Sequence, residues 1–253
     1  MEDLLLLGID TSGKTASAAL FDSDTETFLA QSALYTQKTH SQVIMPMVKD
    51  ILAQAGKEMS DIGGIAVANG PGSYTGLRIG VSMAKGVCYG SDAQLISVPT
   101  LELLCVPVLL GDKIKATSWV DGKDEQLVEE LTDEALLCPM IDARRMEVFA
   151  AVYDRSLKTV RGAQADIVDA DTYRELLDKN IVYFFGNGAL KCREQINHPN
   201  ARYISGVVPL AKNMLPLADK RFHLGKTEDV AYFTPQYLKE YQAKKSRDLL
   251  NRG

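Results

Sequence analysis

The segment Gly8–Thr15 reads G-I-D-T-S-G-K-T and satisfies the P-loop expression G-x-x-x-x-G-K-[ST]. A P-loop requires a strand, a glycine-rich turn and then a helix whose N-terminus faces the phosphates. The apolar run Leu4–Ile9 predicts the strand, but the Phe21–Asp24 turn ends the next segment within about two helical turns. The carboxylate of Asp10 would also repel phosphates unless a metal intervened. The sequence therefore predicts a hairpin, with Lys14 as an ordinary turn residue, and argues against an NTP-binding loop.

A second motif, N-G-P-G-S-Y-T-G-L-R-I-G, follows an apolar run and leads into a segment with helical spacing. Ser73 is expected to cap this helix by accepting a hydrogen bond from one of its first amides. Small residues recur every four positions along one face of the helix, namely Gly72, Gly76, Gly80, Ala84 and Cys88. Glycine inside a helix costs about 1 kcal/mol relative to alanine, so another backbone should come very close. That backbone could belong to the protein's own core or to a partner helix.

The elements that must position these motifs can be read from periodicity and turn signals. The first part of the chain predicts three antiparallel strands (Leu4–Asp10, Lys14–Asp22 and Thr25–Tyr35), helices at Ser41–Ala55 and Tyr74–Tyr89, strands at Gly64–Ala68 and Gln94–Val98, and a helix that begins near Thr100, its expected cap. The later part predicts a hairpin from Cys138, a short helix near Thr172–Lys179, a strand at Ile181–Phe185 and helices at Ala189–Gln195 and within 207–223. Asp124–Leu131 is expected to form a short acidic helix.

Five segments together resemble the TsaB (YeaZ) family: GIDTSGKTASAAL, HSQVIMPMV, NGPGSYTGLRIGVSMAKG, VPTLELL and PMIDARRMEVFAAVY. Their order and spacing match over most of residues 4–154, and the match is loose after residue 155. The resemblance implies an α/β fold with two lobes of the actin, Hsp70 and sugar-kinase (ASKHA) type, with mixed sheets flanked by helices. We expect an N-terminal lobe at 1–104 and a second lobe at 105–253. The second lobe carries an atypical insertion near 106–137 and a basic C-terminal tail.

The resemblance also implies a function. TsaB proteins are non-catalytic partners of their paralogue TsaD in the formation of threonylcarbamoyladenosine (t6A) at position 37 of ANN-decoding tRNAs. ATP or ADP would then belong to partner subunits, a TsaE-like ATPase would join through the complex, and tRNA would be contacted indirectly. The alternative is a catalytically active enzyme of the same fold, either a small-molecule kinase or an M22-type metallopeptidase. A homodimeric scaffold unrelated to tRNA is a third interpretation.

The sequence has few of the residues that a metallopeptidase or a kinase of this fold would need. M22-type proteins hold their metal with two histidines four residues apart on a helix, whereas His40, His198 and His223 are far from one another. We therefore expect no catalytic residue and no metal site. By resemblance, only a vestigial nucleotide site would remain, at the first hairpin, formed by Asp10, Thr11, Ser12 and Gly13.

The partner surface is expected on the two helices of the first lobe. The Ser41–Ala55 helix has an apolar band wider than one core-facing stripe needs. We assign to the interface Val43, Ile44, Met47, Ile51, Gly72, Tyr74, Gly76, Gly80 and Ala84. The two helices are expected to pair with the equivalent helices of TsaD, or with a second copy of this chain when TsaD is absent.

Two later motifs leave alternatives open. The turn I-D-A-R-R-M-E-V lacks the glycines of a phosphate loop. Asp142 could hold a plain hairpin with Arg144 paired to an acid, or Asp142, Arg144 and Arg145 could face a cleft between the lobes. F-F-G-N-G-A-L-K, from Phe184, could be an adenosine-side glycine turn or a plain connection between strand and helix.

Composition limits the remaining function classes. The formal net charge is −5 at pH 7, which disfavours stand-alone nucleic-acid binding because phosphate contacts need clustered Lys and Arg. The four cysteines include no C-x-x-C pair, which argues against a zinc framework and fits reduced thiols. No segment approaches transmembrane length, and the acidic N-terminus does not read as a signal peptide. These features predict a cytoplasmic protein without membrane association.

Overall fold

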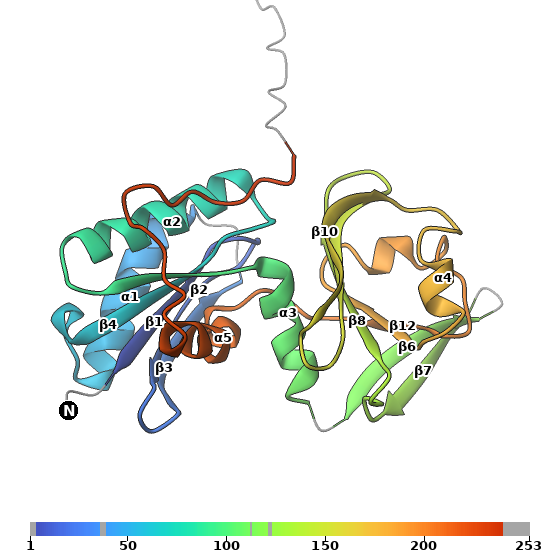
Figure 1. The fold of residues 1–253 in the computed structure, drawn as a ribbon, viewed down its shortest axis with the longest axis horizontal. Coiled ribbons are helices and arrows are strands. Elements are labelled where there is room, and N and C mark those ends of the chain that lie inside the picture. The colour runs from blue at the N-terminus through green and yellow to red at the C-terminus, as the bar shows by residue number, and fades with distance from the viewer. Residues whose placement is uncertain (1–3, 36–38, 112, 121–122, 240–253) are drawn as a thin grey trace, which may run out of the picture.

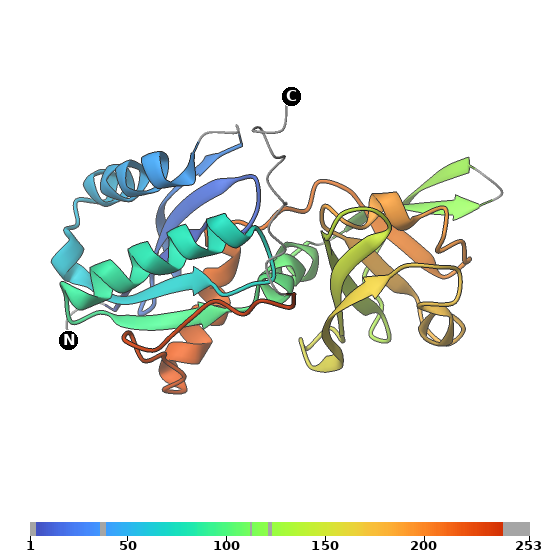
Figure 2. The same cartoon turned by 90° about the horizontal axis from the view of Figure 1, so that it is seen from above.

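The computed structural model describes residues 4–35, 39–111, 113–120 and 123–239. Two lobes are each built on one mixed β-sheet (Figures 1 and 2). The strand order is β3-β2-β1-β4-β5 in the first sheet and β10-β9-β8-β11-β12-β6-β7 in the second. The expected two-lobe α/β architecture, with mixed sheets flanked by helices, is confirmed. The basic tail lies outside the described residues.

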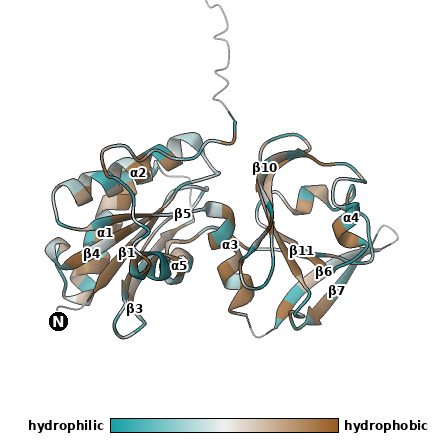
Figure 3. Cartoon of the chain, viewed as in Figure 1, coloured by the Kyte–Doolittle hydropathy of each residue, from teal (hydrophilic) through white to brown (hydrophobic). Residues whose placement is uncertain are grey.

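The first sheet begins with the three antiparallel strands predicted from the sequence, β1 (Leu5–Asp10), β2 (Ala16–Asp22) and β3 (Thr27–Leu34). The strands β4 (Ile62–Ala68) and β5 (Gln94–Val98) continue the sheet in parallel with β1. Every residue of β1 is buried, because helices cover both faces of the sheet at this strand. Figure 3 shows the resulting concentration of hydrophobic residues on the central strands.

Two helices cover one face of the first sheet, α1 (His40–Ala55) and α2 (Tyr74–Tyr89). Both agree with the predicted ranges. The hydroxyl of Ser73 accepts a hydrogen bond of 3.2 Å from the amide of Gly76, so the predicted cap of α2 is confirmed. The helix α1 ends at Gly56, which has a left-handed φ of 63°.

The opposite face of the first sheet is covered by α5 (Ala211–His223), which follows the second lobe in sequence. We assigned these residues to the second lobe by their position, and the packing of α5 against the first sheet corrects that assignment. The chain then runs along β5, where the amide of Glu228 donates to the Leu95 carbonyl at 2.8 Å. Figure 1 shows this last described segment crossing from α5 over the first lobe. It covers the open edge of β5.

The helix α3 (Thr100–Leu109) contacts both α5 and β8, and so connects the two lobes. Its N-cap position is Pro99, so the expectation that Thr100 caps the helix is wrong. The Thr100 hydroxyl is buried and has no hydrogen-bond partner among the described residues. The division of the chain at residues 104 and 105 stays a prediction.

The second sheet has strands β6 (Ile114–Val120), β7 (Lys123–Glu129), β8 (Leu136–Asp142), β9 (Glu147–Tyr153), β10 (Thr159–Ile167), β11 (Val182–Phe185) and β12 (Ala201–Ile204). The predicted hairpin from Cys138 corresponds to β8 and β9, and the predicted short helix to α4 (Arg174–Leu177). The predicted helix at Ala189–Gln195 is reduced to a 3-10 turn, Leu190–Cys192. Another 3-10 turn spans Met59–Asp61.

The expected acidic helix at Asp124–Leu131 is wrong, because these residues form the edge strand β7. Antiparallel pairing with β6 supplies its backbone hydrogen bonds. The charges of β7 are met by basic residues of other elements: Arg193 Nη1 lies 2.9 Å from the Asp124 carboxylate, and Arg202 Nε lies 3.1 Å from that of Glu129. Sequence alone shows the acidic residues but not these distant partners. Charged side chains on an edge strand also discourage pairing with another chain.

Candidate functional site

The first hairpin turn joins β1 to the antiparallel β2, and no helix follows it. The sequence-based rejection of a P-loop is therefore confirmed. Asp10 is wholly buried, and its Oδ1 accepts a hydrogen bond of 3.2 Å from the amide of Ser12. Burial raises the pKa of the Asp10 carboxyl to about 6, although contacts with Ser12 and the charge of His40 act in the opposite direction. Among the described residues, neither Asp10 Oδ2 nor Ser12 Oγ has a hydrogen-bond partner.

The helix α2 closes over this turn. The Thr11 hydroxyl donates to the Gly76 carbonyl at 2.7 Å, and the Ser73 amide donates to the Ser12 carbonyl at 2.7 Å. Thr11 and Ser12 are each only 2% exposed. The hydroxyl groups that the resemblance would direct toward a phosphate are therefore covered by the protein's own helix.

The small-residue face of α2 makes this close approach possible. A Cβ atom on Gly76 would lie 2.0 Å from the Thr11 carbonyl oxygen, and one on Gly72 would lie 2.5 Å from that of Ser12. Gly80 also faces the Thr11 side chain, and Ala84 is buried in the core. Our assignment of Gly72, Gly76, Gly80 and Ala84 to a partner interface is therefore wrong. The open alternative, contact with the protein's own core, is what the structure shows.

The helix α1 also turns most of its assigned interface residues inward. Ile44, Met47 and Ile51 belong to the core beneath α1. The assignment of Met47 and Ile51 to an interface is therefore wrong, whereas Ile44 also lines the groove described below. Val43 is half-buried against the same core, and Tyr74 is half-buried at the start of α2. Any surface that these helices offer to a partner must therefore be made mainly by other side chains.

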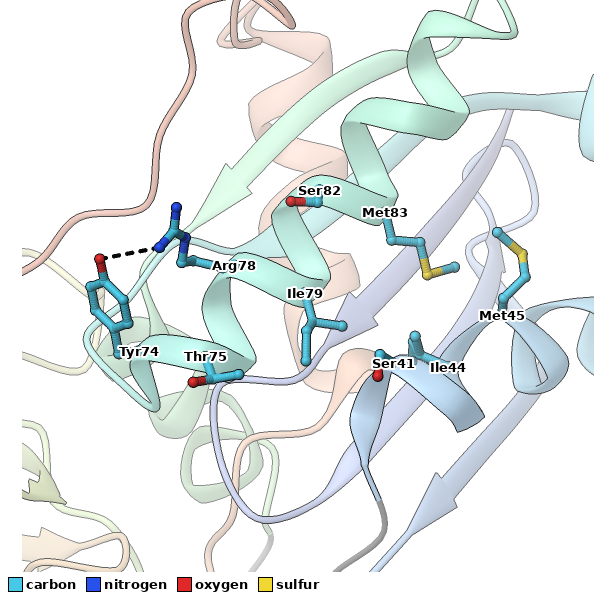
Figure 4. A pocket seen from close by; sticks show the side chains of 9 residues that line it. All are labelled: Ser41, Ile44, Met45, Tyr74, Thr75, Arg78, Ile79, Ser82 and Met83. Carbon is cyan, nitrogen blue, oxygen red and sulfur yellow. Dashed lines mark hydrogen bonds between the residues drawn. The ribbon is translucent and has the colours of Figure 1, made fainter. Parts of the chain in front are cut away.

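A groove of about 500 Å³ lies between α1 and α2, and most of its lining residues are outside the assigned set (Figure 4). Its lining is Ser41, Ile44, Met45, Tyr74, Thr75, Arg78, Ile79, Ser82 and Met83. Figure 4 shows the two methionine side chains extending into the space between the helices. At one end, Arg78 Nη1 donates to the Tyr74 hydroxyl at 3.4 Å. The groove is apolar in the middle and polar at its rim, as protein-binding surfaces commonly are.

Most groove-lining residues of α2 were not predicted from the sequence, because the interface on this helix was assigned mainly to its small residues. The signal was present in the spacing: Thr75, Ile79 and Met83 recur every four residues, as do Tyr74, Arg78 and Ser82. Residues four apart share one row along a helix, and these two rows lie about 100° and about 200° around the helix from the glycine row.

The second hairpin turn, between β8 and β9, contains the other three candidate residues. The amide of Arg144 donates to Asp142 Oδ1 at 2.9 Å, and the Lys191 amine forms an ion pair with the same carboxylate. Asp142 therefore holds the turn, as one interpretation required, but its charged partner is Lys191. Partial burial would raise the pKa of the Asp142 carboxyl, but the hydrogen bonds of Lys191 and Arg144, with the charges of Lys191 and Lys14, hold it below its ordinary value.

The glycines near Phe184 pack against the end of β8. Gly186 has a φ of 94°, and a Cβ atom there would lie 2.4 Å from the Met140 carbonyl oxygen. The side chain of Asn187 accepts a hydrogen bond of 2.9 Å from the amide of Asp142. The glycines are thus explained by close approach of two backbones, which supports the interpretation as a plain connection.

The sequence of this chain is similar to those of TsaB proteins from two bacteria. The chain is 29% identical over 243 residues to the tRNA threonylcarbamoyladenosine biosynthesis protein TsaB of Escherichia coli (strain K12), which covers 92% of this chain and 94% of that protein. It is also 29% identical over 246 residues to TsaB of Bacillus subtilis (strain 168), covering 95% and 96%. The chain is thus similar to TsaB proteins over nearly its whole length. The family model for TsaD, tRNA N6-adenosine threonylcarbamoyltransferase, matches residues 34–131.

The fold of this chain is shared with a solved structure. A protein from Pseudomonas aeruginosa, described as similar to the peptidase YEAZ, superposes with a TM-score of 0.75 at 23% identity. The superposition covers 94% of this chain and all, 100%, of that chain. The predicted fold class is therefore confirmed over nearly the whole length.

A serine, an aspartate and a histidine lie together where α5 contacts the β2–β3 turn. The Ser23 hydroxyl donates to Asp219 and lies 3.0 Å from His223 Nε2, and the same Nε2 lies 3.4 Å from the Asp219 carboxylate. In a hydrolytic triad the imidazole stands between the acid and the serine and uses both ring nitrogens. Here one nitrogen faces both groups, so the cluster fastens α5 to the turn and does not form a proton relay.

Metal and thiol chemistry receive no support within the described ranges. No group of three or more His, Cys, Asp or Glu there could hold a metal ion. The four cysteines are buried and unpaired, and burial raises the pKa of the Cys88 and Cys192 thiols to about 11. None of the helices that can be described is long and apolar enough to cross a membrane.

Proposed function

We propose that this chain is a non-catalytic subunit of a t6A-forming complex in the cytoplasm. It binds a TsaD-like paralogue and supports formation of t6A at position 37 of ANN-decoding tRNAs. A TsaE-like ATPase joins through the complex, and ATP or ADP is bound by the partner subunits. The proposal rests on the TsaB relatives and on the groove between α1 and α2.

The groove is the observation that carries the proposed partner. Its nine lining residues fall within residues 34–131, the part of the chain that matches the TsaD family model. A TsaD-like paralogue should therefore carry a comparable pair of helices. Two such helix pairs can meet across an approximate two-fold axis, as self-complementary surfaces do. The methionines of the groove suit this pairing because their flexible side chains adapt to a partner surface.

Replacing Ser82 by arginine should abolish capture of the TsaD-like partner without unfolding the chain. Ser82 is exposed on α2 and lines the groove, so a long charged side chain there would obstruct the partner and lose its hydration in the contact. We expect the dissociation constant to rise at least about a hundredfold, within the range of a hot-spot change of ~3 kcal/mol. Calorimetric titration with the co-purified partner measures this, beside a thermal unfolding curve.

The matched control is Ala53→Arg, an equally exposed position on α1 that does not line the groove. It should bind the partner like the wild type. If Ser82→Arg folds normally and binds with unchanged affinity, the groove is not the interface. If the wild-type chain instead pairs with a second copy and captures no TsaD-like protein, the homodimeric scaffold is the better interpretation.

The isolated chain should bind ATP weakly or not at all. The Thr11 and Ser12 hydroxyls are covered by α2, and the turn between β8 and β9 offers no glycine backbone to a phosphate. Calorimetry with magnesium and ATP checks this, with the TsaD-like partner as the positive control. Micromolar, magnesium-dependent binding, or turnover of ATP, sugar or peptide by this chain alone, would favour the catalytically active alternative.

A further inference from the structure

The turn between β8 and β9 has an unusual backbone. Arg144 and Arg145 have φ angles of 74° and 49°, both in the left-handed region. Residues with side chains rarely occupy this region, and asparagine and glycine do so most readily. Two consecutive arginines in this conformation are therefore a disfavoured choice for the turn alone. Such positions tend to occur where function requires the side chain.

Lys191 contacts the backbone of the turn as well as its aspartate. Lys191 Nζ donates to the carbonyl oxygens of Arg145 and Glu147 at 2.7 Å each, in addition to its ion pair with Asp142. The amide of Ala143 donates to the Glu147 carbonyl at 3.0 Å. These bonds fix the backbone at both ends of the arginine pair. The two side chains are therefore presented outward from a rigid base.

The carboxylates near the turn pair with lysines and leave both arginine side chains free to bind an anion. Its two carboxylates are already engaged, Asp142 by Lys191 and Glu147 by Lys239. Arg144 and Arg145 are exposed, and within the described part of the chain no carboxylate lies within ion-pair distance of either guanidinium. The charge of Lys14 acts on the same turn from the first lobe. A local positive patch thus exists on a chain whose net charge is −5.

This patch lies next to the end of the α1–α2 groove. The last described segment connects them: Tyr237 packs on Tyr74 with ring centroids 4.7 Å apart, and Lys239 reaches Glu147 in the turn. Tyr74 and Arg78 form that end of the groove. Figure 1 shows β8 on the side of the second lobe that faces the first. A ligand held by a protein in the groove could therefore reach the arginine pair.

We propose that Arg144 and Arg145 contact phosphate groups of the RNA that the partner subunit holds. The inference rests on the proposed function. Guanidinium groups bind phosphate oxygens in a bidentate manner, and such contacts position a nucleic acid without reading its sequence. The turn is open, and neither arginine lines the groove or the smaller pocket beside β3. An open rigid turn suits a long phosphate backbone better than a small anion, which needs to be enclosed.

The test uses the complex with its TsaD-like partner and a transcript of an ANN-decoding tRNA. The variant Arg144→Gly/Arg145→Asn removes both charges with residues that favour the left-handed backbone. We expect its thermal midpoint to stay equal or rise, while RNA affinity falls roughly tenfold near 0.1 M salt. The slope of log affinity against log salt should become shallower by about 1.5, since each phosphate contact contributes about 0.7–0.9. Fluorescence anisotropy at several salt concentrations measures both quantities.

Two controls make the result specific. Arg144→Lys/Arg145→Lys keeps the charges and should retain most of the RNA affinity. Lys113→Gln/Lys115→Gln removes two exposed charges near the start of β6 and should leave affinity and salt slope unchanged. Unchanged RNA binding by the glycine–asparagine variant would overturn the proposal. So would a selective loss of partner capture, because the arginines would then contact an acidic surface of that protein.

Failure of the proposed function is separable from failure of this inference. If the wild-type chain captures no TsaD-like protein, the proposed function fails. The same titration of tRNA is then performed with the chain alone at low salt. There the wild type should bind weakly, and the glycine–asparagine variant should bind at least severalfold more weakly. If the wild type and the variant bind tRNA equally in this titration, the proposed contact between the arginines and RNA is wrong for the chain alone as well.

Discussion

Replacing Gly76 by alanine is expected to destabilise the protein by about 3 kcal/mol or more, at the upper end of overpacking effects. The added Cβ atom would lie 2.0 Å from the Thr11 carbonyl oxygen, a backbone atom that cannot rotate away. Either α2 or the first hairpin turn must move, which would break the hydrogen bond between Thr11 and the Gly76 carbonyl. Chemical denaturation with a spectroscopic readout of secondary structure measures the loss.

The matched control lies on the same helix. Gly86 is exposed, and apart from its chain neighbours and the backbone of its own helix no described atom lies within 4 Å of the position that its Cβ would take. Gly86→Ala should therefore stabilise the protein by up to about 1 kcal/mol through helix propensity alone. A Gly76→Ala protein as stable as the wild type would show that the turn does not approach the helix so closely. Loss of partner binding by an unstable Gly76 variant would say nothing about an interface.

Replacing Asp10 by asparagine is expected to stabilise the protein at pH 8 by as much as about 3 kcal/mol. The folded-state pKa of Asp10 is raised from 3.8 to about 6, and each pKa unit corresponds to about 1.4 kcal/mol. Between these two values the folded state binds more protons than the unfolded state, so stability falls as the pH rises. The penalty is absent below about pH 4 and complete above about pH 6. Asparagine keeps an acceptor for the Ser12 amide and carries no charge.

The measurement is the free energy of unfolding of both proteins from pH 4 to pH 8. The difference between them should grow across this window and then stay constant. Asp50→Asn, at an exposed position on α1, serves as the control and should show no such growth. An Asp10→Asn protein less stable than the wild type at pH 8 would indicate that the carboxylate is needed in its charged form. A bound cation would be one reason for such a need.

Much of the fold followed from local patterns in the sequence. The helix Tyr74–Tyr89 and the strand Gln94–Val98 have the predicted bounds, because apolar spacing, the Ser73 cap and turn residues all act within a few positions. The strand β7 could not be predicted from local patterns, because its pairing with β6 and its contacts with Arg193 and Arg202 decide its conformation. An acidic segment without strong apolar alternation does not carry that information locally.

The site shows the same limit more sharply. The regular spacing of small residues predicted that some backbone approaches α2, and this was correct. Which backbone it is could not be predicted, since Thr11 precedes Gly76 by 65 positions. Once the glycine face was occupied by the first hairpin, the neighbouring face with Ile79 and Met83 became the one that is open to a partner. A pattern identifies a helix face, whereas the three-dimensional neighbour decides its use.

The return of α5 to the first lobe affects the order in which the protein can be completed on the ribosome. The face of the first sheet that contains Leu6, Ala66 and Ile96 is buried by α5. A nascent chain therefore exposes this apolar face during the whole time in which β6 to β12 are synthesised. The second lobe is continuous in sequence and can close earlier. Transiently exposed sheet faces of this kind favour aggregation, so the first-made lobe of this protein is the one that most needs protection by chaperones during translation.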